Sequence, residues 1–173
     1  MKRVNNILDN KEYRKRILEI EELELSREFC GHGFEHLLMV ARLGYAILLE
    51  DMNYGKETIA DTYGLDEAKE LIYASALLHD IGRYSTLEID MGMNHRESGI
   101  YIASPIIRQA GFDRQEEELI LGAIKNHGTM SENPGSLEGI IFRADKKSRN
   151  CFSCKAYDTC NWPKNQKNNN IDI

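Results

Sequence analysis

The chain has 173 residues, 42% of them hydrophobic, and a formal net charge of −6. This length suits one domain with its own hydrophobic core, and the hydrophobic fraction argues against a disordered chain. The negative charge argues against nonspecific binding to nucleic acid or to an anionic membrane, because both would repel the protein. The sequence shows neither a signal peptide nor an apolar run of the roughly 18 to 20 residues that a membrane span needs. We therefore expect a cytoplasmic protein.

Hydrophobic periodicity predicts consecutive helices and hence an all-α fold, because strand-like alternation is scarce. The first predicted helix is highly charged and runs from Glu12 to about Arg27. Its inner face would carry Ile17, Ile20 and Leu23, which recur at helical spacing.

The next two predicted helices form the centre of the domain. One begins near Phe34 and fades between Asp51 and Gly55. The other, Asp66 to Asp80, is apolar around most of its circumference. That distribution is typical of a buried central helix.

Capping residues delimit three further helices. Asn94 would cap a helix that ends at Gly111, although Pro105 inside it predicts a kink or a break. Asp113 would cap the following helix, and Ser136 would begin the last core helix.

The side chains able to bind a metal gather at helix ends and on inward faces. Asp145 follows Leu137 and Ile141 at intervals of four residues, so it should point into the core, where an unpaired carboxylate is costly. His127 lies on the apolar stripe of its helix. A lone histidine at such a position is more often a core residue than a ligand.

His79 and Asp80 end the most buried predicted helix. A carboxylate there opposes the negative end of the helix dipole, and a bound cation would reverse that penalty. The alternative is that Asp80 caps the following turn. Imidazole and carboxylate together suit iron, manganese, nickel or zinc without any thiolate. The candidate ligands, enough for two ions bridged by Asp80, are His36, His79 and Asp145 at one ion and His95 and His127 at the other.

The order of these residues resembles the HD superfamily of metal-dependent phosphohydrolases. The resemblance covers roughly residues 30–149 and rests on the strings HGFEHLLMVARLGYAI, ASALLHDIGR, NHRESG, KNHG and FRADKKSR. The intervening His95 and His127 are similar to the six-ligand, two-metal branch, and the spacing is similar to that of bacterial HD-type diadenosine tetraphosphate hydrolases. The resemblance implies a single-domain HD-type helical bundle that hydrolyses a nucleotide or another small organic phosphate, with iron first among the candidate metals.

Two departures narrow the resemblance. Arg83 stands where related enzymes often carry lysine, although either can hold a phosphate. HRESGIYIA stands where the GYP signature of cyclic-dinucleotide phosphodiesterases would be, which argues against that substrate. A di-iron oxygenase of the HD fold and a non-catalytic nucleotide- or metal-sensing module remain alternatives.

Three catalytic roles are expected. Paired cations would lower the pKa of a shared water and neutralise phosphate oxygens, while Asp80 orients that water. Arg83 would bind the substrate phosphate. His32 lies one turn before His36 and would donate a proton to the leaving group or orient a ligand; otherwise it is a partly exposed histidine near a helix cap.

The four cysteines suggest a second, structural metal site. Cys151, Cys154 and Cys160 have the spacing of zinc or iron–sulfur ligands, and Cys30 would be the fourth. In that case the four sulfurs should lie within about 4 Å of one another. The alternative is a mobile tail with reduced cysteines.

The domain organisation follows from these assignments. We expect an N-terminal helix packing on the core at 1–29, the HD metal-binding domain at 30–149, and a Cys-rich segment at 150–173 whose tail is frayed from Lys164. The expected partner is a small phosphate compound such as a nucleotide, with neither nucleic acid nor membrane.

Overall fold

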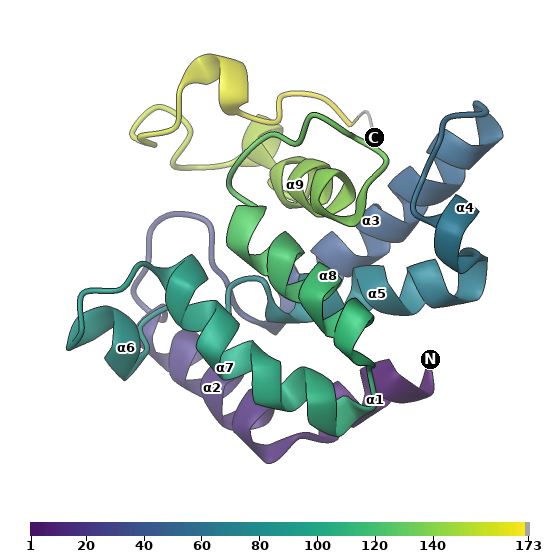
Figure 1. Cartoon of the computed structure of the whole chain (residues 1–173). Coiled ribbons are helices and arrows are strands. Elements are labelled where there is room, and N and C mark those ends of the chain that lie inside the picture. The colour runs from purple at the N-terminus through teal and green to yellow at the C-terminus, as the bar shows by residue number, and fades with distance from the viewer. Residues whose placement is uncertain (172–173) are drawn as a thin grey trace.

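The computed structural model describes residues 1–171. Within these residues it contains α-helices and no β-strand, as the sequence predicted. None of these helices is both long and apolar enough to cross a lipid bilayer. Two short 3₁₀ turns, Cys151–Ser153 and Lys164–Gln166, follow the last helix. In chain order the α-helices are α1 (Lys2–Asp9), α2 (Lys11–Leu23), α3 (Phe34–Asn53), α4 (Ala60–Tyr63), α5 (Leu65–Leu78), α6 (Thr86–Ile89), α7 (His95–Ala110), α8 (Arg114–Asn126) and α9 (Leu137–Lys147), as shown in Figure 1.

The core is built around α5. This helix packs against α3, α8 and α9, and Figure 1 shows it in the interior of the bundle. Leu71, Ile72, Leu77 and Leu78 are all no more than 1% exposed, so α5 buries several sides at once. The predicted central helix is confirmed, and its end places His79 and the residue after it at the middle of the molecule.

The predicted caps of the three later helices are confirmed. The side chain of Asn94 accepts hydrogen bonds at the start of α7 in a capping box with Glu97. Asp113 forms the same motif with Glu116 at the start of α8, and Ser136 caps α9. These ends are set by contacts within four residues, which explains why the sequence alone predicts them.

Pro105 does not break α7. The helix runs through it to Ala110 and stops at Gly111, whose φ of 99° is left-handed. Proline removes one backbone donor. The neighbouring Ile106 and Ile107 are fully buried, and α7 packs against α8 and α1, which compensates for that loss.

The N-terminal region differs from the single helix predicted at 12–27. It forms two helices, with the Asn10 side chain capping the second through the amides of Glu12 and Tyr13. Ile17 and Ile20 are buried as expected, but Leu23 is 59% exposed, because α2 ends there and the chain turns away from the core.

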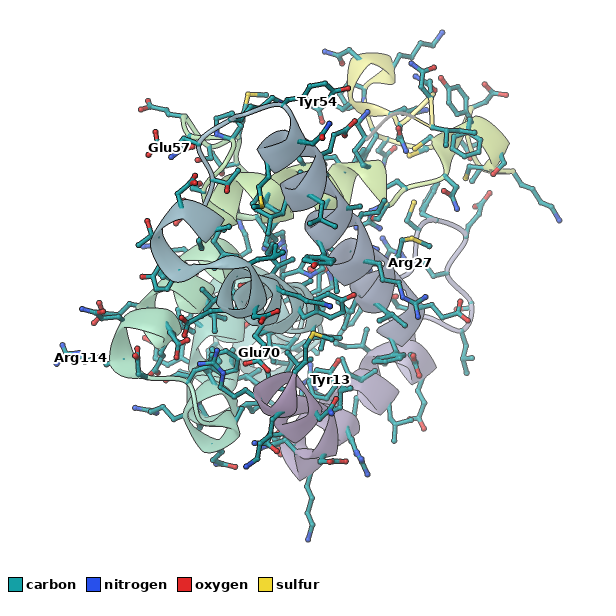
Figure 2. The ribbon with its side chains drawn as sticks, turned by 90° about the vertical axis from the view of Figure 1, so that its right-hand side faces the viewer. Tyr13, Arg27, Tyr54, Glu57, Glu70 and Arg114 are labelled. Atoms are coloured by element: carbon teal, nitrogen blue, oxygen red, sulfur yellow. The ribbon has the colours of Figure 1, made fainter. Side chains whose placement is uncertain are left out.

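An ion-pair cluster attaches α1 to the core. The Arg3 guanidinium lies 2.5 Å from Glu70 of α5 and 2.5 Å from Glu116 of α8. Figure 2 shows Glu70 close to the N-terminal helices, whereas Arg114 projects outward. The first helix therefore joins two core helices that are far apart in the sequence.

The C-terminal segment, residues 151–171, folds back on α9. Asn168 donates to the carbonyl of Lys147 at the end of α9 (2.9 Å), and Lys167 donates to the carbonyl of Tyr157. Ala156 is only 5% exposed. Within the tail predicted to fray from Lys164, Asn168 thus contacts α9, while residues 172–173 lie outside the described residues.

Candidate metal centre

Histidines and aspartates from five helices or helix ends converge beyond the last turn of α5. All six predicted metal ligands lie in this cluster. They are His36 on α3, His79 and Asp80 after α5, His95 at the start of α7, His127 at the end of α8 and Asp145 on α9.

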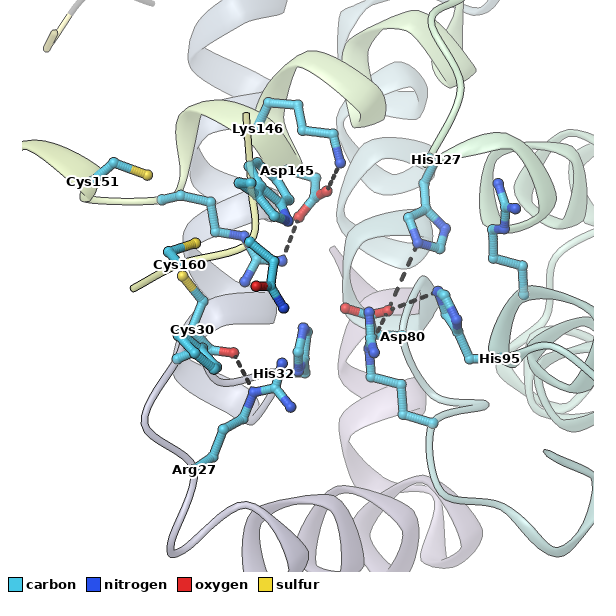
Figure 3. Close-up of a pocket in the computed structure, with 17 residues that line it drawn as sticks. Arg27, Cys30, His32, Asp80, His95, His127, Asp145, Lys146, Cys151 and Cys160 are labelled. Carbon is cyan, nitrogen blue, oxygen red and sulfur yellow. Dashed lines mark hydrogen bonds and ion pairs between the residues drawn. The ribbon is translucent and has the colours of Figure 1, made fainter. Parts of the chain in front are cut away.

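Asp80 lies at the centre, with one carboxylate oxygen towards each of two histidine pairs. Its Oδ2 is 3.3 Å from Nε2 of His79 and 3.9 Å from Nε2 of His36. Its Oδ1 is 3.6 Å from Nε2 of His95 and 3.7 Å from Nε2 of His127. Figure 3 shows the last two rings converging on Asp80. Each pair forms with Asp80 a group close enough to hold a metal ion.

Asp145 adjoins the first of these groups. Its Oδ1 is 3.4 Å from Nε2 of His36 and 3.9 Å from Nε2 of His79. The same carboxylate accepts from Arg149 at 3.0 Å and from Lys146 at 2.8 Å. The structure thus brings Asp145 to the centre, where two cationic side chains compensate its buried charge.

The donor atoms are suited to a metal ion. Within residues 1–171, the buried Nε2 atoms of His79 and His95 have no hydrogen-bond partner. The Nδ1 atoms of His79 and His127 each lie 2.7 Å from a backbone carbonyl, of Ala76 and Ile124 respectively. These bonds place the proton on Nδ1 and leave the Nε2 lone pair available, as in metal-binding histidines.

Three imidazoles are held neutral, the form that binds metal. Burial lowers the pKa of His127 to about 3 and also lowers that of His36. The pKa of His95 is lowered by burial and by the nearby Arg83. At neutral pH these rings can therefore act as ligands without losing a proton.

The adjacent pair His79 and Asp80 behaves differently. Burial alone would raise the pKa of Asp80, but His79 and Arg83 hold it well below its usual range. Burial alone would lower the pKa of His79, but Asp80 and Asp145 raise it. Asp80 therefore stays ionised, and the two carboxylates favour the protonated form of His79, whose Nε2 must lose its proton to bind a metal.

The turn after Asp80 is held by close packing. A Cβ at Gly82 would lie 2.0 Å from the carbonyl oxygen of His95, so only glycine lets this turn approach α7. From α2, the buried Arg16 donates to the carbonyls of Ile81 (3.4 Å) and Arg83 (2.5 Å). These contacts hold the turn that follows Asp80 against α2 and against the start of α7, where His95 lies.

A cavity of about 400 Å³ opens beside the centre and is rich in cationic side chains. Arg83 lines it and donates from Nε to Asp80 Oδ1 at 2.8 Å. Four further cations also line it, and sequence reasoning missed them: Arg27, Arg96, Lys146 and Arg149.

Two of the missed cations left a signal in the sequence. Arg149 follows Asp145 by four residues, the spacing at which helical side chains meet. Gly128 directly follows His127, and a Cβ there would lie 2.8 Å from Nη1 of Arg96. The absence of a side chain at Gly128 therefore leaves room for the Arg96 guanidinium beside His127.

His32 is buried, so the alternative of a partly exposed histidine near a helix cap is wrong. Its Nδ1 lies 2.6 Å from Glu24, which also accepts the backbone amide of His32 (2.6 Å) and the hydroxyl of Tyr84 (3.0 Å). Burial lowers the pKa of His32 to about 4. Glu24 was not predicted, because nothing local connects a carboxylate in a charged helix to a histidine eight residues later.

The cysteines lie near one another without forming a compact cluster. Cys30, Cys151 and Cys160 line the cavity beside the metal centre, as Figure 3 shows. In the described chain, no three cysteine sulfurs come within 4.8 Å of one another, and all four are free thiols. The expectation of four sulfurs within about 4 Å is therefore not met, and metal binding by the cysteines stays a prediction.

The chain is thus an all-helical domain whose central histidines and aspartates could hold metal ions. Residues 33–150 match the model of the HD domain, and the chain belongs to the HD domain family. A protein of Clostridium beijerinckii described as an uncharacterized protein is 37% identical over 169 residues, which cover 97% of each chain. No solved structure matches the chain significantly.

Proposed function

We propose that the protein is a metal-dependent phosphohydrolase that acts on a nucleotide or another small organic phosphate. The observation that carries this proposal is Asp80, whose two oxygens face two separate histidine pairs. Membership of the HD domain family supports the same activity at the level of the superfamily. The similarity to HD-type diadenosine tetraphosphate hydrolases remains a proposal about substrate.

Two ions fit the donor atoms better than one. His36, His79 and Asp145 would hold the first with Asp80, and His95 and His127 would hold the second with the same carboxylate. Bound divalent metals lower the pKa of water and neutralise phosphate oxygens during hydrolysis. Imidazole and carboxylate suit iron, manganese, nickel and zinc, and we take iron as the first candidate.

The cations around the cavity would hold the phosphate. The chain carries a net charge of −6, yet five cationic side chains and only two carboxylates line this cavity. Arg83 is suited to bind phosphate oxygens through its Nη atoms, because its Nε is already directed to Asp80. The site therefore favours an anionic ligand on a protein that otherwise repels anions.

His32 is suited to accept a proton or a hydrogen bond. The Nδ1 contact with Glu24 leaves Nε2 as the free nitrogen, and the lowered pKa keeps the ring neutral near pH 7. A neutral ring with its proton on Nδ1 has none to donate from Nε2. We therefore propose that His32 accepts a hydrogen bond from water in the cavity, in place of the proton-donor role.

The proposal is tested on protein purified without added metal. Metal content is measured by mass spectrometry, and phosphate release is screened against nucleotides and simple phosphate esters. Phosphate release that disappears in Asp80→Ala and persists in the exposed control Asp90→Ala supports hydrolysis. Oxygen consumption without phosphate release would indicate an oxygenase, and bound metal with neither activity would indicate a sensing module; either result would overturn the proposal.

A further inference from the structure

The cavity beside the metal centre has two walls of different chemistry. One wall carries the metal-centre residues, among them Asp80 and His127. The other is formed by the loop before α3 and by residues 151–162, which lie outside the segment that matches the HD domain. Figure 3 shows Cys151 and Cys160 of this second wall across the cavity from His127. Two aromatic residues, Phe29 and Trp162, also line the cavity.

Trp162 lies one side chain away from the metal centre. The Lys146 Nζ is 4.9 Å from the centre of the indole ring and 2.8 Å from Asp145 Oδ2. The Arg149 guanidinium carbon is 5.9 Å from the same ring, and this arginine donates to Asp145 at 3.0 Å. The indole therefore adjoins two of the five cationic side chains that line the cavity.

The backbone on both sides of Trp162 is anchored. Before it, the Cys160 amide donates to the Ala156 carbonyl at 2.9 Å, and Ala156 is buried. After it, Asn168 donates to the carbonyl of Lys147 at 2.9 Å. The fold of the segment thus holds the ring in the cavity wall. Trp162 is the only tryptophan in the sequence.

We propose that Trp162 stacks on a planar ring of the substrate, so that the substrate is a nucleotide and not an organic phosphate without an aromatic ring. Aromatic side chains stack on every base, while cations beside them hold the phosphate. The cations that line the cavity and the indole beside them match the phosphate and the base of a nucleotide. This inference rests on the proposed function for the phosphate end of the site.

The alternative is that Trp162 only packs the segment against α9. Phe152 offers a matched control, because it is an aromatic residue of the same segment, is 49% exposed and does not line the cavity. If Trp162 had a packing role alone, its loss would change the affinity for ligands with and without a base equally.

The experiment uses stopped-flow fluorescence of Trp162 in the full-length protein as purified. Two nucleotides, AMP and GMP, are each compared with ribose 5-phosphate, which keeps the sugar and the phosphate and lacks the base. We expect at least one nucleotide to quench the fluorescence and to bind roughly 10- to 100-fold more tightly than ribose 5-phosphate. In the variants, affinity is measured by ligand competition with a fluorescent nucleotide.

Trp162→Ala should remove the preference for the base and keep the affinity for the base-free ligand, whereas Trp162→Phe and Phe152→Ala should keep the preference. Equal binding of nucleotides and base-free ligands, or no binding of either, overturns the inference. Phosphate release with equal kcat/KM on both kinds of ligand would support the proposed hydrolase function and reject the inference about Trp162. A Trp162-dependent preference without phosphate release would leave the inference standing and reject the hydrolase.

Discussion

The metal centre and the C-terminal segment line one cavity, but different forces hold them in place. The centre lies at the ends of α5 and α8, whose inner residues are completely buried. The segment contains one buried apolar residue, Ala156. It is attached to α9 by the hydrogen bond from Asn168 to Lys147 and by Lys146 over the Trp162 ring, whereas Lys167 contacts Tyr157 within the segment. Apolar burial contributes more than such polar surface contacts. Changes in the segment should therefore alter ligand binding, whereas changes in the centre should alter metal binding and stability.

The largest effect is expected at the centre, from Asp80→Ala. Both potential metal groups share this carboxylate, so its loss should remove both ions. The activation free energy that corresponds to kcat/KM should rise by at least about 4 kcal/mol. Metal analysis and phosphate release measure the two consequences. Full metal content in the variant would show that Asp80 does not bridge the groups.

Arg83→Ala tests the boundary between the centre and the cavity. Metal content should stay intact. The decrease in kcat/KM should correspond to roughly 2 to 4 kcal/mol of activation free energy, because a charge-assisted contact with the phosphate and its positioning are lost. Arg83→Lys is the control and should recover part of the activity, since the charge is kept without the planar fork. Unchanged kcat/KM on the true substrate would exclude this role.

The third prediction concerns pH and the burial of His32. Its pKa of about 4 in the folded protein lies below the ordinary value of 6.5, so the unfolded chain binds more protons between these two values. The stability of the metal-free protein should therefore fall as pH drops from 6.5 towards 4, with His32 contributing up to about 1.4 kcal/mol per pH unit. Urea unfolding of wild type and His32→Gln measures this, and the difference between the two curves isolates His32. Parallel curves would contradict the assignment.

How far the sequence predicts this molecule depends on the range of the contacts. Asn94 and Asp113 could be predicted because a cap bonds within three residues of itself. Asp145 could be predicted because its helical spacing places it inside. Glu24 and Trp162 could not, because their roles depend on contacts between separate elements, such as Trp162 with Lys146. The N-terminal helix α1 was missed because it is short; only Val4 and Ile7 are buried on it, and its ion pairs with Glu70 and Glu116 join separate elements.

The smallest effect is expected in the C-terminal segment, from Cys154→Ser. In the described structure, polar contacts hold the segment and no three cysteine sulfurs lie within 4.8 Å of one another. The variant should therefore keep its metal content and change the free energy of unfolding by less than about 0.5 kcal/mol. Asn168→Ala provides the comparison, since it removes the hydrogen bond to Lys147 and should cost about 1 kcal/mol. Loss of one metal equivalent in Cys154→Ser, with a larger loss of stability than in Asn168→Ala, would reverse this conclusion. It would mean that the cysteines close around a metal and that the segment, like the centre, depends on bound metal for its folding.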